Sequence, residues 1–209
     1  MPRHEPADDL KQVFRWLAVL WAIELIDHLA TFLLVRDAKL GDDGLFDMLL
    51  GLHPWDPHHA LLPQLGWGVV GMVCAPLLHA GWYHLFQNSL ALGLLGYLSL
   101  RYSNTLTWAA IGYSTVCSAV LTWLIAPPDQ VHVGASGVIF GLVGFLLANG
   151  IIRRGCLPLI LSLVVFVLYG GALIGMLPQV AAQHISWQMH LGGFIGGLGA
   201  AWHLRNEKA

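Results

Sequence analysis

The sequence predicts an all-α membrane protein in which six helices cross the bilayer as one bundle. Of its 209 residues, 56% are hydrophobic and only 11% are charged, which leaves too little polar surface to cover a water-soluble protein of this size. Six apolar stretches approach the ~20 residues that a helix needs to cross the hydrocarbon core, where exposed backbone is not tolerated. The net charge of −2 gives no basic surface for a nucleic acid.

The first apolar stretch, residues 13–35, follows a polar, acidic start instead of the basic region of a cleavable signal peptide, so we expect it to be retained as a helix. The other five stretches lie at 82–100, 106–126, 134–152, 156–176 and 185–202. Before the second stretch, the short segment Gly66–Cys74 is apolar but broken by glycines, so we expect it to be interfacial or re-entrant.

The distribution of lysine and arginine predicts the orientation. Threading six spans places eight of these ten residues on the side of the termini, and such an excess marks the cytoplasmic side. We therefore expect a plasma-membrane protein with a cytoplasmic tail at 1–12, a membrane domain at 13–204, an external loop at about 36–80 and a cytoplasmic tail at 205–209. Only two of the basic residues fall in the external loop: Arg36 and Lys39.

A Gly-Ala-Ser-Gly run, residues 134–137, opens the fourth stretch and places Ser136 at a helix N-terminus. Free backbone N–H groups and the helix dipole stabilise developing negative charge there, as acyl transfer requires. Gly137, Gly141 and Gly144 form a small-residue stripe that lets another helix approach closely. Taken alone, a serine in this place is more often a helix N-cap or a small packing residue.

The sixth stretch carries His190, with Gly193 and Gly197 on the same helical face. This face could meet a glycine-striped neighbour such as the fourth helix. An imidazole in apolar surroundings favours the neutral form, whose free nitrogen can accept a hydroxyl proton. No acidic residue within a span pairs with His190, so we expect a Ser-His dyad rather than a triad, although a lone histidine here is more often an interhelical hydrogen-bond partner.

The start of the second stretch carries His84 and Asn88, four residues apart. One helical turn places both on one face, where two N–H donors could stabilise an oxyanion. The open alternative is a hydrogen-bonded pair that stabilises the bundle, and we expect nearby His79 to be mainly structural. In the threaded topology, His84, Ser136 and His190 all fall near the external ends of their helices, at one depth.

These residues resemble the rhomboid intramembrane serine proteases, which carry His-x-x-x-Asn on the second helix, Gly-x-Ser-Gly opening the fourth, and a histidine followed by spaced glycines on the sixth. The resemblance covers about residues 65–202. It implies Ser136 as nucleophile, His190 as general base, and His84 and Asn88 with the Ser136 N–H as oxyanion donors, with Gly134, Phe140 and Gly193 near the site. It also implies transmembrane protein substrates, cut near the outer end of a helix where glycine or proline weakens it.

The sequence departs from this family at two places. Val70 and Gly71 stand in the external segment where many relatives have Trp-Arg, so the anchoring of the loop is expected to differ. Phe140 stands where a hydroxyl-bearing aromatic residue is common; it can stack on the base but cannot offer a phenolic hydrogen bond.

Other polar residues have less specific interpretations. Glu24, Asp27 and His28 share a face of the first span, which we expect to pack or anchor in a polar environment, with a proton path or a gating role left open. The external loop segment His53–His59 has residue types that could ligate a transition metal. We expect three further histidines to be interfacial or solvated: His132, His184 and His203.

Hydrolysis of membrane-anchored proteins is the function that these patterns favour, and they require no metal or organic cofactor. Two alternatives from other classes remain. A catalytically inactive rhomboid-like protein could bind transmembrane clients through the same glycine-lined surface. A small transporter using the polar face of the first span is disfavoured because the sequence lacks paired broken helices. The oligomeric state is not predicted.

Overall fold

The computed structural model describes residues 5–35, 44–59, 61–178 and 185–207, and these residues are α-helical apart from turns, two 3-10 segments and one isolated β-bridge between Leu52 and His132. The elements in chain order are α1 (Pro6–Leu34), α2 (Leu45–Leu50), α3 (Leu61–Cys74), η1 (Ala75–Leu77), α4 (Gly81–Tyr102), α5 (Asn104–Ile125), α6 (Ser136–Ile152), α7 (Cys156–Tyr169), η2 (Gly170–Met176) and α8 (Trp187–His203).

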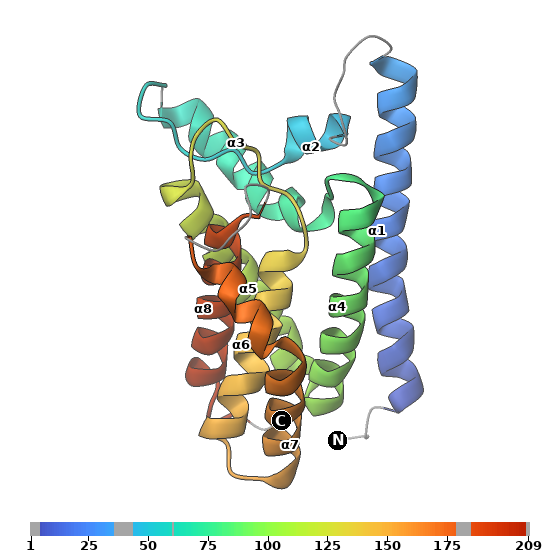
Figure 1. Ribbon diagram of the computed structural model, residues 1–209, viewed down its shortest axis with the longest axis vertical. Helices are drawn as coiled ribbons and strands as arrows, with labels where there is room; N and C mark the ends of the chain where they lie inside the picture. Colours follow the sequence, from blue (N-terminus) through green and yellow to red (C-terminus); the bar gives the residue numbers. More distant parts are fainter. Residues whose placement is uncertain (1–4, 36–43, 60, 179–184, 208–209) are drawn as a thin grey trace.

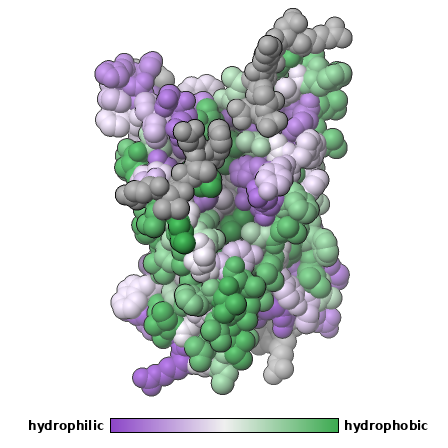
Figure 2. Space-filling model, viewed as in Figure 1, coloured by the Kyte–Doolittle hydropathy of each residue, from purple (hydrophilic) through white to green (hydrophobic). Residues whose placement is uncertain are grey.

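The long helices form a bundle, with α1 along α4 at one edge and with α2 and α3 gathered at one end (Figure 1). The start of α1 and the end of α8 lie toward the other end. Hydrophobic residues cover much of the middle of the face shown in Figure 2, including the area over α7. This distribution fits a molecule whose sides contact lipid.

Helices lie at all six expected stretches, although not all satisfy the length and hydropathy expected of a full crossing. Within the described residues, α1, α5 and the stretch from α7 through η2 are long and apolar enough, and a fourth span is added if the segment Gln64–Leu77 and α4, bent by 73°, count as one. With 17 residues each, α6 and α8 fall short of the usual ~20. The number of six crossings therefore stays a prediction.

Two helix ends differ from the expected apolar stretches. The first helix begins at Pro6, and its first turns are tied to the end of α4 because Arg101 donates to the buried carboxylate of Asp9 at 2.8 Å. The fifth stretch is α-helical only to Tyr169 and then continues as η2, which begins with Gly170. Glycine lowers helix propensity, so a change of helix type at this point is physically reasonable.

Small residues bring α5, α6 and α8 into close contact. A Cβ added to Gly137 or Gly141 of α6 would collide with the hydroxyl groups of serines on α5. A Cβ added to Gly193 or Gly197 of α8 would collide with the backbone carbonyls of Gly137 or Gly141. The glycine faces of the fourth and sixth stretches therefore meet, and these helices have little freedom to slide apart.

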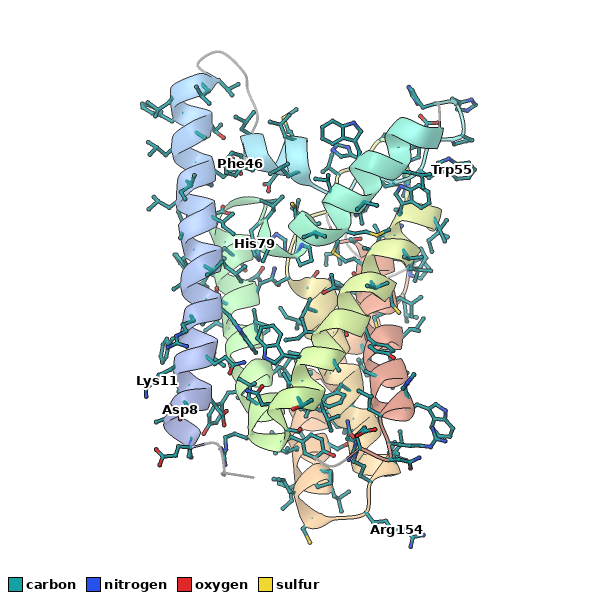
Figure 3. All side chains as sticks on the ribbon, turned by 180° about the vertical axis from the view of Figure 1, so that it is seen from behind. Asp8, Lys11, Phe46, Trp55, His79 and Arg154 are labelled. Atoms are coloured by element: carbon teal, nitrogen blue, oxygen red, sulfur yellow. The ribbon has the colours of Figure 1, made fainter. Side chains whose placement is uncertain are left out.

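The short helix α2, which the sequence pattern did not predict, depends on the polar face of α1. The Asp27 carboxylate accepts the N–H of Phe46 at 2.8 Å, and the Thr31 hydroxyl accepts the N–H of Leu45 at 2.8 Å. These bonds satisfy N–H groups that a helix leaves free in its first turn. Figure 3 shows Phe46 between α1 and α2. Asp27 therefore has an anchoring role, the interpretation favoured by the sequence.

Helix α3 packs closely where this chain has glycine. A Cβ on Gly71 of α3 would lie 2.6 Å from the Cα of Leu52 and 2.8 Å from the carbonyl oxygen of Gly51. A larger residue would not fit, so α3 lies directly against Gly51 and Leu52. Four basic residues used for the orientation lie outside the described residues: Arg3, Arg36, Lys39 and Lys208.

Candidate active site

The first part of the site is the contact between Gly134 and α4. Gly134 has a φ of +119°, a backbone conformation that favours glycine. A Cβ at this position would also lie 2.7 Å from Cε1 of His84, 2.9 Å from its Nε2 and 3.3 Å from Nδ2 of Asn88. The turn that leads into Ser136 therefore touches both expected oxyanion residues, and only glycine permits the approach.

Both of these side chains present N–H groups at that turn. Nδ1 of His84 accepts the backbone N–H of Ala80 at 3.3 Å, so a neutral His84 ring carries its proton on Nε2, the nitrogen nearer Gly134. Nδ2 of Asn88 is buried and has no acceptor among the described residues. A buried amide without an acceptor is uncommon in folded proteins and costs about 1–3 kcal/mol, so this donor is available to a bound group.

Ser136 is the first residue of α6, and Ala135 is its N-cap residue. The Ser136 hydroxyl makes no capping bond; its polar contact in the described structure is with Sδ of Met189, at 3.9 Å. The side chain is partly exposed. This geometry does not support the N-cap interpretation of Ser136, and it leaves the hydroxyl available for chemistry.

His190 follows Met189 on α8 and lies flat against Phe140, with ring centroids 4.1 Å apart and an interplanar angle of 13°. Nδ1 of His190 is 3.4 Å from the carbonyl oxygen of Gly175 in η2. Because a carbonyl only accepts, this contact requires a proton on Nδ1 and leaves the Nε2 lone pair free in the neutral ring. The His190 tautomer is thus the opposite of that of His84, as expected for a base and a donor.

Ser136 and His190 lie across the α6–α8 contact from each other but are not hydrogen bonded. Among the described residues, no hydrogen bond joins them, since the Ser136 hydroxyl is turned toward Met189. Catalytic hydrogen bonds are often long or misaligned in unliganded proteins. A rotation of the serine side chain about χ1 is the movement that would direct its hydroxyl away from the methionine sulfur.

Two contributors to the site were missed or underrated by sequence reasoning. His79, expected to be mainly structural, is buried, and its Nε2 accepts the N–H of Ala135 at 3.5 Å, immediately before Ser136. Its ring also packs edge-on against His84, with centroids 5.3 Å apart, and Figure 3 shows it in the interior near η1. The carbonyl of Gly175 had no sequence signal, because a backbone group acquires its role only from the fold.

The remaining candidates lie outside this site. In the His53–His59 segment, Nδ1 of His59 is 2.7 Å from the Asp56 carboxylate, and the backbone N–H of His58 holds the pKa of Asp56 below its usual range. No group of three or more potential metal ligands occurs in the described part of the chain. Glu24 is buried one turn from His28, whose ring packs against a tryptophan of α4.

The expectation that His132 is interfacial or solvated is wrong. Its backbone pairs with Leu52 in the isolated bridge, which draws the side chain inward to 5% exposure. Burial, with a smaller contribution from nearby His53, lowers the pKa of His132 to about 4. His203 is exposed and contacts the Tyr113 hydroxyl, and His184 lies outside the described residues.

Comparison with known proteins identifies relatives over most of the chain. A family model described as the Rhomboid domain matches residues 66–207. An uncharacterized protein of Mycobacterium tuberculosis is 33% identical over 201 residues, which cover 92% of this chain and 73% of the relative. A Bacillus subtilis protein with a provisional rhomboid protease name, YdcA, is 32% identical over 127 residues, or 58% of this chain and 60% of the relative. No solved structure gives a significant match.

Proposed function

The chain belongs to the rhomboid family, and from this membership together with the geometry of the site we propose that it is an intramembrane serine endopeptidase. Its substrates are membrane-anchored proteins that are cut near the outer end of a transmembrane helix. Ser136 is the nucleophile and His190 the general base. The observation that carries this proposal is the pair of N–H donors, on His84 and Asn88, that converges on the turn leading into Ser136.

The proposed reaction has two steps. Nε2 of His190 takes the Ser136 hydroxyl proton as Oγ attacks the scissile carbonyl carbon, and the carbonyl oxygen becomes an oxyanion held by His84 Nε2–H, Asn88 Nδ2–H and the Ser136 backbone N–H. The tetrahedral intermediate expels the amine, which receives the proton from His190. Water then attacks the acyl-enzyme with His190 again as base, releasing the acid product and restoring the serine.

The proposed topology places the site within reach of water. We propose six spans in the plasma membrane, with both termini cytoplasmic, tails at 1–12 and 205–209 and a membrane domain at 13–204. The loop at 36–80 is then external. Because Ser136 begins α6, and His84 and His190 lie in the first turns of α4 and α8, all three lie near one end of the bundle, on the side of α2 and α3.

The competing function is passive binding of transmembrane clients. A binding protein needs the close glycine contacts but has no use for a free serine hydroxyl, a free imidazole lone pair and a buried amide without an acceptor. The two histidine tautomers and the Asn88 donor therefore favour hydrolysis. Neither proposal requires a metal or organic cofactor.

Purified protein in liposomes with a single-span reporter substrate tests the proposal. We expect Ser136→Ala to abolish cleavage and labelling by a fluorophosphonate serine probe. Ser162→Ala is the matched control, since Ser162 on α7 bonds to the Leu147 carbonyl far from the site, and should cleave and label like the parent. Equal cleavage by Ser136→Ala and the parent would refute the assignment, whereas binding of the reporter without labelling of the parent would favour the client-binding function.

A further inference from the structure

A cleft of about 480 Å³ lies at the end of the bundle remote from the candidate active site. It is formed by the ends of α4 and α6, the start of α7 and the turn after α8. Three arginines line it: Arg153, Arg154 and Arg205. Figure 3 shows Arg154 at this end of the molecule and Trp55 at the other. No part of the proposed protease mechanism uses these arginines.

Carboxylates of the described residues form no ion pair that compensates the positive charge of this cleft. The guanidinium of Arg153 donates to the backbone carbonyls of Leu204 and Glu207, both at 2.6 Å, and these acceptors are neutral. Within the described part of the chain, none of the three cleft arginines forms an ion pair. Arg101 at the same end, by contrast, is paired with Asp9. The cleft therefore concentrates three cations that attract an anion from outside the chain.

Aromatic residues order two of the guanidinium groups and indicate the depth of the cleft. Arg205 lies 4.6 Å from the ring centroid of Trp202, and Arg153 lies 5.9 Å from that of Tyr102. Tryptophan and tyrosine are enriched at the boundary between membrane and water. Trp202 is 62% exposed at the end of α8. The cleft thus lies at the depth of lipid headgroups, with two guanidinium groups already positioned.

The opposite wall of the cleft is apolar and continues onto the outer surface of α7. Ile152, Leu157 and Pro158 line the cleft beside the arginines. Leu157 is half exposed, and Leu159 and Ile160, which follow it on α7, are exposed as well. A ligand that fits has an anionic group for the arginines and an apolar chain that can follow α7.

We propose that this cleft binds the phosphate headgroup of an anionic phospholipid. Guanidinium groups match phosphate oxygens with paired N–H donors, and basic pockets between the ends of transmembrane helices are suited to such headgroups. Arg153, Arg154 and Arg205 hold the phosphate, and the outer surface of α7 holds an acyl chain. The bound lipid links α7 to the ends of α6 and α8, and this site is independent of the protease proposal.

Native mass spectrometry of the purified full chain, with phosphatidylglycerol or phosphatidylcholine of the same acyl chains, tests the proposal. We expect one tightly retained phosphatidylglycerol and no comparable phosphatidylcholine. The double variant Arg154→Gln/Arg205→Gln removes two cleft charges and leaves the Arg153 bonds to the turn after α8 intact. Each arginine near an anionic lipid surface raises the binding constant about five-fold. Losing two of them should therefore weaken the binding of phosphatidylglycerol about 25-fold.

The matched control is Lys11→Gln/Arg15→Gln, which removes two exposed charges from α1, on the same end of the protein but outside the cleft. It should retain the lipid like the parent. Equal losses in both double variants would overturn the proposal, since diffuse surface charge would then explain the binding. Inorganic phosphate at the same concentration should not displace the lipid; displacement would overturn the assignment to a lipid headgroup. Unfolding temperatures in phosphatidylcholine, expected to be equal for all three proteins, verify the fold.

Discussion

Replacing Gly193 by alanine tests whether the α6–α8 contact positions His190, the proposed base, against Ser136, the proposed nucleophile. A Cβ on Gly193 would overlap the backbone carbonyl of Gly137 and lie 3.0 Å from its Cα. The atoms in the way are backbone, so no side chain can rotate aside. Relief of the overlap requires α8 to move away from α6 by about 1 Å, and a displacement of that size in a catalytic group can lower the rate about 100-fold.

The loss of stability should be smaller than the ~2.7 kcal/mol that a 100-fold loss of rate represents. Overpacking costs about 1–3 kcal/mol, and replacing glycine by alanine within a helix returns up to about 1 kcal/mol. The net loss is therefore about 0–2 kcal/mol. Gly199→Ala is the matched control on the same helix, because its Cβ would have only Tyr113 nearby, at 4.0 Å.

Reporter cleavage in liposomes and thermal unfolding should be measured side by side for both alanine variants. We expect Gly199→Ala to cleave like the parent and Gly193→Ala to be folded but slow. If Gly193→Ala cleaves as fast as Gly199→Ala, the close contact does not position the dyad and this reasoning fails. If Gly193→Ala does not fold, Gly197→Ala, with the same kind of collision one turn further from His190, provides the second test: it should also be slow.

Three further predictions follow from single contacts. Gly71→Ala, whose Cβ would crowd Leu52, should lower the free energy of unfolding by about 0–2 kcal/mol once the gain in helix propensity is subtracted, whereas Gly66→Ala on the same helix meets open space and should raise it by up to about 1 kcal/mol. The pKa of His132 falls from 6.5 in the unfolded chain to about 4 in the folded protein. The free energy of unfolding should therefore decrease as the pH falls from 6.5 to 4, by about 3 kcal/mol in total. His132→Gln should reduce this dependence of the unfolding free energy on pH, and an unchanged dependence would refute the assignment to His132. Phe140→Ala removes a stacking contact worth about 0.5–1.5 kcal/mol and should slow cleavage about 2- to 10-fold, whereas Phe140→Tyr should cleave like the parent.

The positions of the long helices could be predicted because hydropathy and length alone identify apolar stretches. The residues of the candidate site could also be proposed from the sequence, since helical spacing places His84 beside Asn88, and His190 on the face of Gly193. The short helix α2 could not be predicted from local pattern. Its first turn depends on the hydrogen bonds that Phe46 and Leu45 donate to Asp27 and Thr31 of α1, which precede α2 by 14 to 19 residues.

Contacts between backbone segments that are distant in the sequence could not be predicted either. His132 looked solvated because it lies in a polar loop, and only its pairing with Leu52 buries it. The role of Gly175 depends on the carbonyl that η2 presents to His190, and any residue type could supply that carbonyl. Composition and spacing predict how side chains are distributed along a helix or a loop, whereas these two features depend on the position of the backbone in the folded protein.

The distribution of free hydrogen-bonding groups favours catalysis over passive binding on energetic grounds. A buried amide donor without an acceptor, such as Nδ2 of Asn88, destabilises the folded protein by about 1–3 kcal/mol. Leucine at that position would remove this cost and still pack against Gly134 in a protein that only holds clients. A donor that finds its acceptor only when a carbonyl oxygen becomes an oxyanion gives its hydrogen bond to the transition state, which is where a catalyst needs it. Asn88→Leu should therefore raise the unfolding temperature while slowing cleavage, and a variant that loses both stability and activity would show instead that Asn88 supports the bundle.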